Sequence, residues 1–189
     1  VPLMIHVPWL PNSFGQRTSA LVELIDVMPT AAAIAGLPAP ADVDGVDISP
    51  LLQASPDSAS GGLGRGLARE LQAAYHQYPA CGCNENGTAC FNQTRGGCNN
   101  SPRTQFGFMG YSVRTSVWRY TAWFHWDPTT LSPLWGADYA EELYNHTGDH
   151  SYEMDRYENV NQAEAYPAVA KELHSQLRDF FSAHQTVRA

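Results

Sequence analysis

Four cysteines lie within 18 residues of one another, and their spacing bounds the chemistry that they can do. They are Cys81, Cys83, Cys90 and Cys98. A cluster of thiols can form disulfides or hold a metal ion. Structural zinc prefers pairs of cysteines separated by two to four residues, whereas the gaps here are one, six and seven residues. The spacing therefore favours two disulfides over a zinc site, and it leaves three pairings open.

Four asparagines stand in the Asn-x-Ser/Thr pattern of an N-glycosylation acceptor. Three lie among the cysteines, in a stretch (79–102) rich in glycine and asparagine, and one comes later: Asn86, Asn92, Asn99 and Asn145. Disulfides persist in oxidising compartments, and such sequons mark proteins of the secretory pathway. The stretch 79–102 is therefore predicted to be a disulfide-bonded, glycosylated surface loop of a lysosomal or secreted protein.

Arg114 stands next to Val113 in a run that alternates between the two faces of a predicted strand. Its guanidinium could bind an anion. An arginine inside an apolar sheet is rarely buried without a partner, however. The setting favours a structural ion pair that holds the sheet to a neighbouring segment, and anion binding stays open as the alternative.

The N-terminal elements indicate an α/β layer. Residues 3–7 form a short apolar run between two prolines, which predicts a buried strand. Asp26 can cap a following alanine-rich helix, and Gly36 can end it. Residues 55–66 are rich in serine and glycine and predict a linker. We therefore expect residues 1–54 to form a first unit.

Residues 67–189 predict a subdomain in which a small antiparallel sheet packs on a terminal helix. The runs 108–115 and 117–126 are typical of strands and meet at Thr115, which predicts a hairpin. After Pro167, apolar residues recur at helical spacing, which predicts a final helix with one buried face. The apolar residues of that face are Val169, Ala170, Leu173, Leu177, Phe180 and Phe181.

Composition argues against two classes of protein, those that bind nucleic acid and those that span a membrane with a helix. The net charge is −8 and the pI is about 5.2, and the 11 lysines and arginines form no cluster, which argues against nucleic-acid binding. No apolar run approaches the roughly 18–20 residues of a membrane-spanning helix. The chain opens at Val1 inside an apolar run, without an initiator methionine or a signal-peptide pattern, so we expect it to be part of a longer protein.

Several segments, in consistent order, resemble the C-terminal part of the sulfatase family, and three of them, 75–79, 109–115 and 118–123, resemble more narrowly its iduronate-2-sulfatase branch. The segments 1–3, 22–30, 35–38, 44–47 and 50–52 are similar to the end of the large domain of sulfatases, and 75–79, 109–115, 118–123, 142–146 and 158–161 are similar to the smaller part after it. The resemblance implies the end of a sulfatase (alkaline-phosphatase-like) α/β domain, followed by a C-terminal subdomain. The cysteine-rich stretch 79–102 falls outside the resemblance and looks like an insertion.

The resemblance also implies a mechanism. In sulfatases a cysteine in a C-x-P-x-R motif becomes formylglycine, whose hydrate attacks the sulfate ester, and a calcium ion stabilises the sulfate oxygens. None of the four cysteines here is followed by that motif, and no calcium ligands can be transferred to this sequence. We therefore expect the chain alone to be inactive and to act with an N-terminal catalytic portion on a sulfated carbohydrate.

The resemblance places His76, Gln77 and Tyr78 in a loop near the mouth of the active site, where polar groups and a ring could contact a sugar. The simpler interpretation is a turn held by Pro79. The branch often has arginine after this proline, whereas this chain has Ala80, which leaves the substrate open. A second function also stays open: a non-catalytic secreted module that binds through its disulfide-bonded, glycosylated loop.

Overall fold

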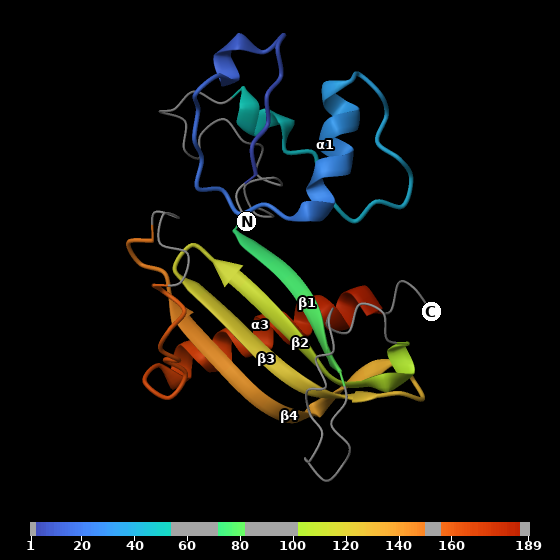
Figure 1. Ribbon diagram of the computed structural model, residues 1–189, viewed down its shortest axis with the longest axis vertical. Coiled ribbons are helices and arrows are strands. Elements are labelled where there is room, and N and C mark those ends of the chain that lie inside the picture. The colour runs from blue at the N-terminus through green and yellow to red at the C-terminus, as the bar shows by residue number, and fades with distance from the viewer. Residues whose placement is uncertain (1–2, 54–71, 82–101, 150–155, 186–189) are drawn as a thin grey trace. The chain divides into compact units, whose positions relative to one another are not determined.

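The computed structural model describes residues 3–53, 72–81, 102–149 and 156–185. It divides the chain into two units, Val1–Ala74 (unit 1) and Tyr75–Ala189 (unit 2), and each is described by itself. Figure 1 shows helix α1 in unit 1, and a sheet with helix α3 in unit 2. The predicted linker 55–66 lies outside the described residues.

The predicted helix of unit 1 is confirmed as α1, Val27–Ile34, which a 3₁₀ turn, Leu24–Asp26, precedes. Alanine is the strongest helix former, and Ala31, Ala32 and Ala33 lie within it. The helix ends at Ile34, and Gly36 follows two residues later with a positive φ of 68°, which suits a residue without Cβ. The amide of Gly36 donates to the carbonyl of Ala33 at 3.0 Å.

Asp26 is buried, but its carboxylate does not cap α1 as the sequence predicted. The two carboxylate oxygens accept instead from the amides of Glu23, at 2.8 Å, and Val46, at 2.9 Å. The hydroxyl of Thr30 donates to the carbonyl of Asp26 at 2.6 Å and accepts from the amide of Ile48 at 3.0 Å. The segment 46–48 is thereby tied to the start of α1, because its amides find buried acceptors there.

The predicted strand over residues 3–7 is wrong. This run is irregular, Met4 is 89% exposed, and only Val7 is buried. The amide of Leu10 donates to the carbonyl of Val7 at 3.0 Å, so the chain turns there. An apolar run becomes a strand only where a neighbouring strand takes its hydrogen bonds, and the structure describes no strand in residues 3–53. The α/β layer expected for residues 1–54 is therefore not seen in that described part.

Unit 2 contains a four-stranded sheet in the order β1-β2-β3-β4. The strands are β1 (Ala73–Cys81), β2 (Phe106–Thr115), β3 (Trp118–Asp127) and β4 (Ser132–Asn145). β2, β3 and β4 pair antiparallel, and helix α3, Pro167–Gln185, lies along one face of the sheet (Figure 1). The predicted hairpin and terminal helix are both confirmed, whereas β1 and β4 were not predicted.

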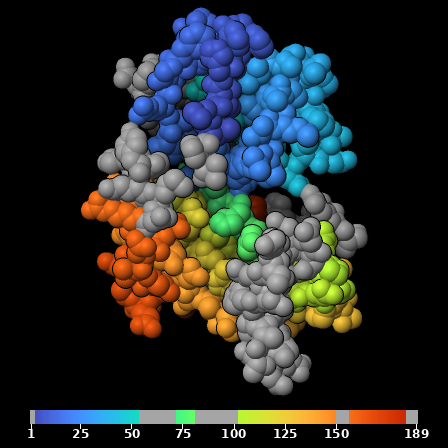
Figure 2. Space-filling view, viewed as in Figure 1, coloured from blue at the N-terminus to red at the C-terminus, as the bar shows by residue number. Residues whose placement is uncertain are grey.

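The core of unit 2 lies between the sheet and α3. Alternate residues of the strands meet the apolar face of the helix, because side chains alternate across a strand and recur every three to four residues along a helix. The ring of Tyr75 stacks on Phe180 with centroids 3.7 Å apart. In the space-filling view little of the red α3 is visible (Figure 2). The residues buried here include Met109, Tyr111, Val113, Tyr120, Ala122, Phe124, Leu143, Ala170, Leu173 and Leu177.

The segment around Pro79 is a strand and not the predicted loop or turn. β1 lies at an edge of the sheet, and an edge strand tolerates proline because one of its sides needs no ladder hydrogen bonds. His76, Gln77 and Tyr78 are therefore strand residues whose side chains alternate between the two faces. Most of the predicted insertion 79–102 lies outside the described residues.

Candidate functional site: the open face of the sheet

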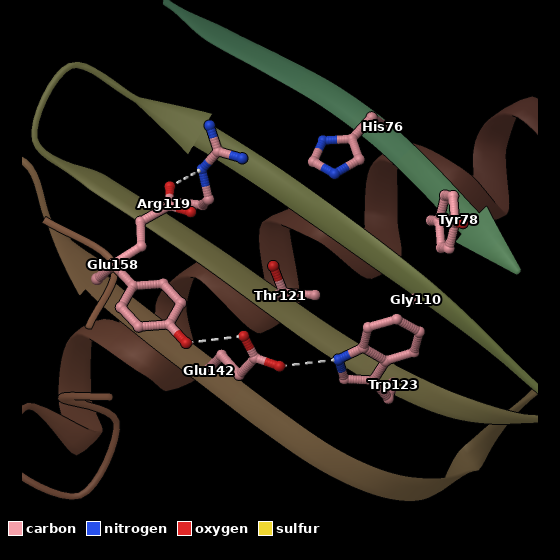
Figure 3. A pocket seen from close by; sticks show the side chains of 9 residues that line it. His76, Tyr78, Gly110, Arg119, Thr121, Trp123, Glu142 and Glu158 are labelled. Atoms are coloured by element: carbon pink, nitrogen blue, oxygen red, sulfur yellow. Dashed lines mark hydrogen bonds and ion pairs between the residues drawn. The ribbon is translucent and has the colours of Figure 1, made fainter. Parts of the chain in front are cut away.

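The sheet face opposite α3, which we call the open face, contains a hollow of about 230 Å³. Alternate residues of all four strands line the hollow, together with one residue from the segment before α3. Rings, charged groups and a hydroxyl converge there (Figure 3). The lining residues are His76, Tyr78, Gly110, Arg119, Thr121, Trp123, Glu142, Tyr144 and Glu158.

The carboxylate of Glu142 holds two of the rings in place. One oxygen accepts from the indole nitrogen of Trp123 at 3.1 Å, and the other accepts from the hydroxyl of Tyr144 at 2.9 Å (Figure 3). Burial, followed by the bond to Glu142, raises the pKa of Tyr144 to about 12. Both oxygens are used in this way, so Glu142 acts as a fixed acceptor that orients the rings.

Gly110 and Trp123 lie opposite each other in the β2–β3 register. A Cβ added to Gly110 would lie 2.8 Å from Cζ3 of the indole and 2.9 Å from both Cε3 and Cη2. These nearly equal distances show that the ring presents its face, and not its edge, to the glycine. A glycine is required at this position because any larger side chain would displace the ring.

Positive charge gathers at the other end of the hollow. Arg114 and Arg119 are directly opposite in the β2–β3 register. Burial, and then the charge of Arg119, lowers the pKa of Arg114, and the same two causes in the same order lower the pKa of His76. Like charges this close destabilise one another, and the nearby carboxylates of Asp149 and Glu158 oppose this by raising the pKa of Arg114.

Glu158 provides part of that negative charge. One of its oxygens lies 2.8 Å from Nε of Arg119 and 3.2 Å from Nε2 of the buried His146. Neither nitrogen has a hydrogen bond of good geometry, so these contacts are ion-pair contacts at most. His146 also lies 2.8 Å from Asp149 through Nδ1. The segment that follows β4 is thus held against β3 by charged groups.

The structure separates the three residues that the sequence grouped as substrate contacts. His76 and Tyr78 both line the hollow, whereas Gln77, between them on β1, does not. The reason is the twofold alternation of a strand. A contact between these residues and a substrate stays a prediction.

The other predicted site residues have different outcomes. Arg114 is half-buried and donates from Nη1 to the carbonyl of Thr115, and its predicted ion pair stays a prediction. Asn145 ends β4, and its side-chain oxygen accepts from the amide of Thr147 at 2.8 Å. Cys81 is the last residue of β1. The remaining predicted disulfide and glycosylation residues lie outside the described residues: Cys83, Cys90, Cys98, Asn86, Asn92 and Asn99.

Sequence reasoning did not assign Trp123, Glu142, Tyr144 or Glu158 to a site. Trp123 was taken as a strand former and, like the other three, as part of a family likeness. The available signal was the spacing of Arg119, Thr121 and Trp123, because alternate residues of one strand share a face.

Within the part of the chain that the structure describes, no group of three or more His, Cys, Asp or Glu side chains is placed to hold a metal ion. The described residues therefore do not fit the calcium site that the resemblance implies for the family. None of the described helices is both long and apolar enough to span a membrane.

A four-stranded antiparallel sheet with a helix on one face, and with rings and charged groups on the other, defines a subdomain of the α+β class. No family profile matches the chain. The chain is, however, 33% identical over 144 residues to iduronate 2-sulfatase of Mus musculus, a match that covers 69% of this chain and 24% of that protein. The chain belongs to the sulfatase family, as a partial match to iduronate 2-sulfatase in its C-terminal quarter.

Two solved structures are also similar to the chain. One is a candidate sulfatase from Bacteroides thetaiotaomicron, with a TM-score of 0.48 and 18% identity, and the other is a 2-O GAG sulfatase, with a TM-score of 0.47 and 17% identity. Each match covers 85% of this chain and 24% of the other. Because both TM-scores lie below 0.5, the family rests on the sequence match. The chain spans about a quarter of the length of the relatives that it matches.

Proposed function

We propose that the chain is the C-terminal part of a sulfatase that hydrolyses sulfate esters of sulfated glycans, and that it acts with an N-terminal catalytic portion. The observation that carries this proposal is the 33% identity to iduronate 2-sulfatase. The formylglycine nucleophile and the calcium ligands would come from that other portion. Residues 1–189 would not supply the nucleophile of the hydrolysis, because none of their cysteines stands in a C-x-P-x-R motif.

The surface of unit 1 supports the proposal. Nine large apolar side chains are exposed among residues 3–53, and exposed apolar side chains that lie together mark surfaces that a partner covers. We propose that the catalytic portion of the same protein covers them, as the end of a larger α/β domain would require. The most exposed are Met4 (89%), Leu24 (87%), Trp9 (65%), Leu37 (62%) and Met28 (60%).

The test compares two proteins. The first is residues 1–189, and the second is the product of the full natural transcript, expressed with the enzyme that generates formylglycine. We expect the upstream sequence to encode C-x-P-x-R, and we expect only the longer protein to release sulfate from a sulfated glycan. Replacing the motif cysteine by alanine in the longer protein is the control and should abolish release. A transcript that carries only an export leader ahead of Val1 would overturn the proposal.

We also propose a lysosomal or secreted location. The support is the cluster of four cysteines with interleaved sequons in residues 81–101, together with the sequon at Asn145. Peptide mapping of native material without reduction should find two disulfides, and glycosidase treatment should convert at least one sequon asparagine to aspartate. Free thiols and unmodified asparagines throughout would contradict this location.

A further inference from the structure

We propose that His146 is a proton-dependent clasp of unit 2. When Nε2 of its ring carries a proton, the ring binds Asp149 and Glu158 at once, and when that proton is lost the contact with Glu158 is released. The clasp joins two segments, the turn after β4, which contains His146 and Asp149, and the segment before α3, which contains Glu158. The inference concerns unit 2 itself and does not rest on the proposed sulfatase activity.

The imidazole of His146 lies between two carboxylates. Its Nδ1 lies 2.8 Å from Oδ2 of Asp149, and its Nε2 lies 3.2 Å from Oε1 of Glu158. The side chain of His146 is only 6% exposed, so water has little access to the ring. The backbone amide of His146 donates to the carbonyl of Val117 at 2.7 Å, which holds the residue beside the turn between β2 and β3.

The two contacts place different demands on the ring. A neutral imidazole has one N–H group and one lone pair, whereas an imidazolium donates from both nitrogens. In the neutral ring the proton belongs on Nδ1, where the contact with Asp149 is a hydrogen bond. The lone pair of the buried Nε2 would then face Glu158, and the described residues give this nitrogen no hydrogen bond of good geometry. Protonation of Nε2 replaces this repulsion by attraction between opposite charges, so the observed arrangement is that of the charged ring.

Glu158 is the partner that a neutral ring would release. Its Oε1 also lies 2.8 Å from Nε of Arg119, so Arg119 and His146 share one oxygen (Figure 3). The side chain of Glu158 is 36% exposed, against 18% for Asp149, so water can solvate its carboxylate more readily. The amide of Asp149 donates to the carbonyl of His146 at 3.0 Å, which keeps the turn after β4 in place with either form of the ring.

Other ionisable groups lie near the clasp or feel the charge of its carboxylates. They come from all four strands and from the segment before α3, and they are His76, Arg114, Arg119, Tyr144 and Tyr157. The two arginines disfavour a further positive charge on the ring. The two carboxylates favour it, and they contact the ring itself at 2.8 and 3.2 Å. Because Coulomb attraction falls with distance, we expect the carboxylates to dominate. The ring of Tyr157, which is stacked on the imidazole at 18° with centroids 6.0 Å apart, also favours a cation.

The clasp acts on one wall of the hollow, because Glu158 is one of its lining residues. Further along the same segment, the amide of Gln162 donates to the carbonyl of Leu143 at 2.8 Å, and the side-chain oxygen of Asn161 accepts from the amide of Leu143 at 2.9 Å. A charged His146 therefore adds to the contacts that tie residues 158–162 to β4 and to the turn after it. In an acidic compartment such as a lysosome the clasp would be engaged.

The experiment measures amide hydrogen exchange at Gln162 in the 189-residue chain by NMR, at about pH 5.5 and about pH 8, because histidine changes charge between these values. Each variant is compared with the wild type at the same pH, so the intrinsic effect of pH on exchange cancels. We expect His146→Gln, which cannot become charged, to exchange about tenfold faster than the wild type at the lower pH and at most about twofold faster at the higher pH. An equal difference at both pH values would overturn the proton dependence, and no difference at either would overturn the clasp.

A variant of the other partner and a matched control sharpen this test. Glu158→Gln should show the same pH dependence, and it serves alone if His146→Gln does not fold. The double variant should exchange no faster at the lower pH than the faster single variant, because both changes remove one contact. The control is His76→Gln, since His76 also feels the charge of Glu158, and it should leave the pH dependence at Gln162 intact. Loss of that dependence in His76→Gln would overturn the assignment to His146.

Nitrogen NMR of labelled histidine tests which ring atom of His146 holds the proton. At about pH 8 we expect a proton on Nδ1, bonded to Asp149, and at about pH 5.5 a proton on both nitrogens. A proton on Nε2 alone at the higher pH would mean that the neutral ring keeps its contact with Glu158, and would overturn the clasp.

Discussion

Units 1 and 2 differ in how their apolar side chains are used. In unit 1 the buried apolar residues of the core are Val7 and Ile48, while nine large apolar residues of its described part are exposed. In the described part of unit 2 eleven apolar residues are buried, and the rings of Tyr111, Tyr120 and Phe124 are less than 2% exposed. The difference shows that unit 2 contains its own core, whereas the described part of unit 1 is held together mainly by polar contacts around Asp26 and Thr30.

The largest effect should come from removing a core side chain of unit 2. Leu177 of α3 is fully buried, and Leu177→Ala should lower the free energy of unfolding of this unit by about 2–5 kcal/mol through lost burial and a cavity. Urea unfolding followed by near-ultraviolet circular dichroism measures the change. The matched control is Leu24→Ala, at a leucine of unit 1 that is 87% exposed, and it should cost less than about 0.5 kcal/mol. Equal costs at the two leucines would contradict the comparison.

The next effect concerns the polar contacts of unit 1. Thr30→Val keeps the shape of the side chain but leaves the buried amide of Ile48 without its acceptor, which should cost about 1–3 kcal/mol. Amide hydrogen exchange at Ile48 measures this local stability directly, and we expect faster exchange. Thr130→Val, at an exposed hydroxyl of unit 2 that bonds Asp127, is the control and should leave exchange at Ile48 unchanged. Slow exchange in Thr30→Val would mean that unit 1 has another source of stability.

The elements that were predicted correctly are those with a local pattern. The hairpin of β2 and β3 and the helix α3 each repeat their apolar residues at the period of their own geometry. β4 has no such pattern, because Gly136 and several acidic residues interrupt it and its pairing with β3 shifts register twice. The resemblance placed residues of β1 in a loop, and Pro79 suggested a turn as the alternative; a strand tolerates this proline because β1 lies at an edge of the sheet. Residues 3–7 have a strand-like pattern but no described neighbouring strand.

The site was predictable only in part, for a related reason. His76 and Tyr78 were singled out from neighbouring positions, and the alternation of a strand then excluded Gln77 from the hollow. The bond between Trp123 and Glu142 joins residues 19 apart on two strands, and one of those strands was not predicted. Contacts of this kind depend on strand register, which the local sequence does not specify.

A smaller effect tests whether Glu142 holds the side chains of the open face of unit 2 in place. Glu142→Gln removes the charge beside Tyr144 and weakens its hydrogen bond, so the pKa of Tyr144 should fall from about 12 toward its ordinary value of about 10. It should stay above 10, because burial is the largest cause of the shift. Carbon-13 NMR of labelled tyrosine measures the titration. Glu141→Gln is the matched control, since its carboxylate bonds Tyr120 instead, and it should leave Tyr144 unchanged.

The raised pKa of Tyr144 determines how the stability of unit 2 changes with pH. A tyrosine that is harder to ionise in the folded state stabilises the fold fully below the ordinary pKa of about 10, and that contribution is lost as pH rises through about 12. Wild-type unit 2 should therefore lose stability over this range, and Glu142→Gln should show a smaller loss. If Glu142→Gln lost as much stability as the wild type between about pH 10 and 12, the hydrogen bond to Glu142 would not be what holds the ring of Tyr144.

The smallest effect lies at the charged end of the hollow. Burial, and then Arg119, lowers the pKa of His76 below its ordinary value of about 6.5. The unfolded chain therefore binds the proton more readily, so stability is full above pH 6.5 and is lost as pH falls through the lowered pKa. Because the side chain of His76 is only partly covered and keeps contact with solvent, the loss should be slight. Arg119→Gln should raise the pKa of His76 in an NMR titration, both by removing the arginine charge and by freeing Glu158, while Arg103→Gln should not. A pKa of His76 that is indifferent to Arg119 would mean that the charge of Arg119 does not act on His76 across the open face.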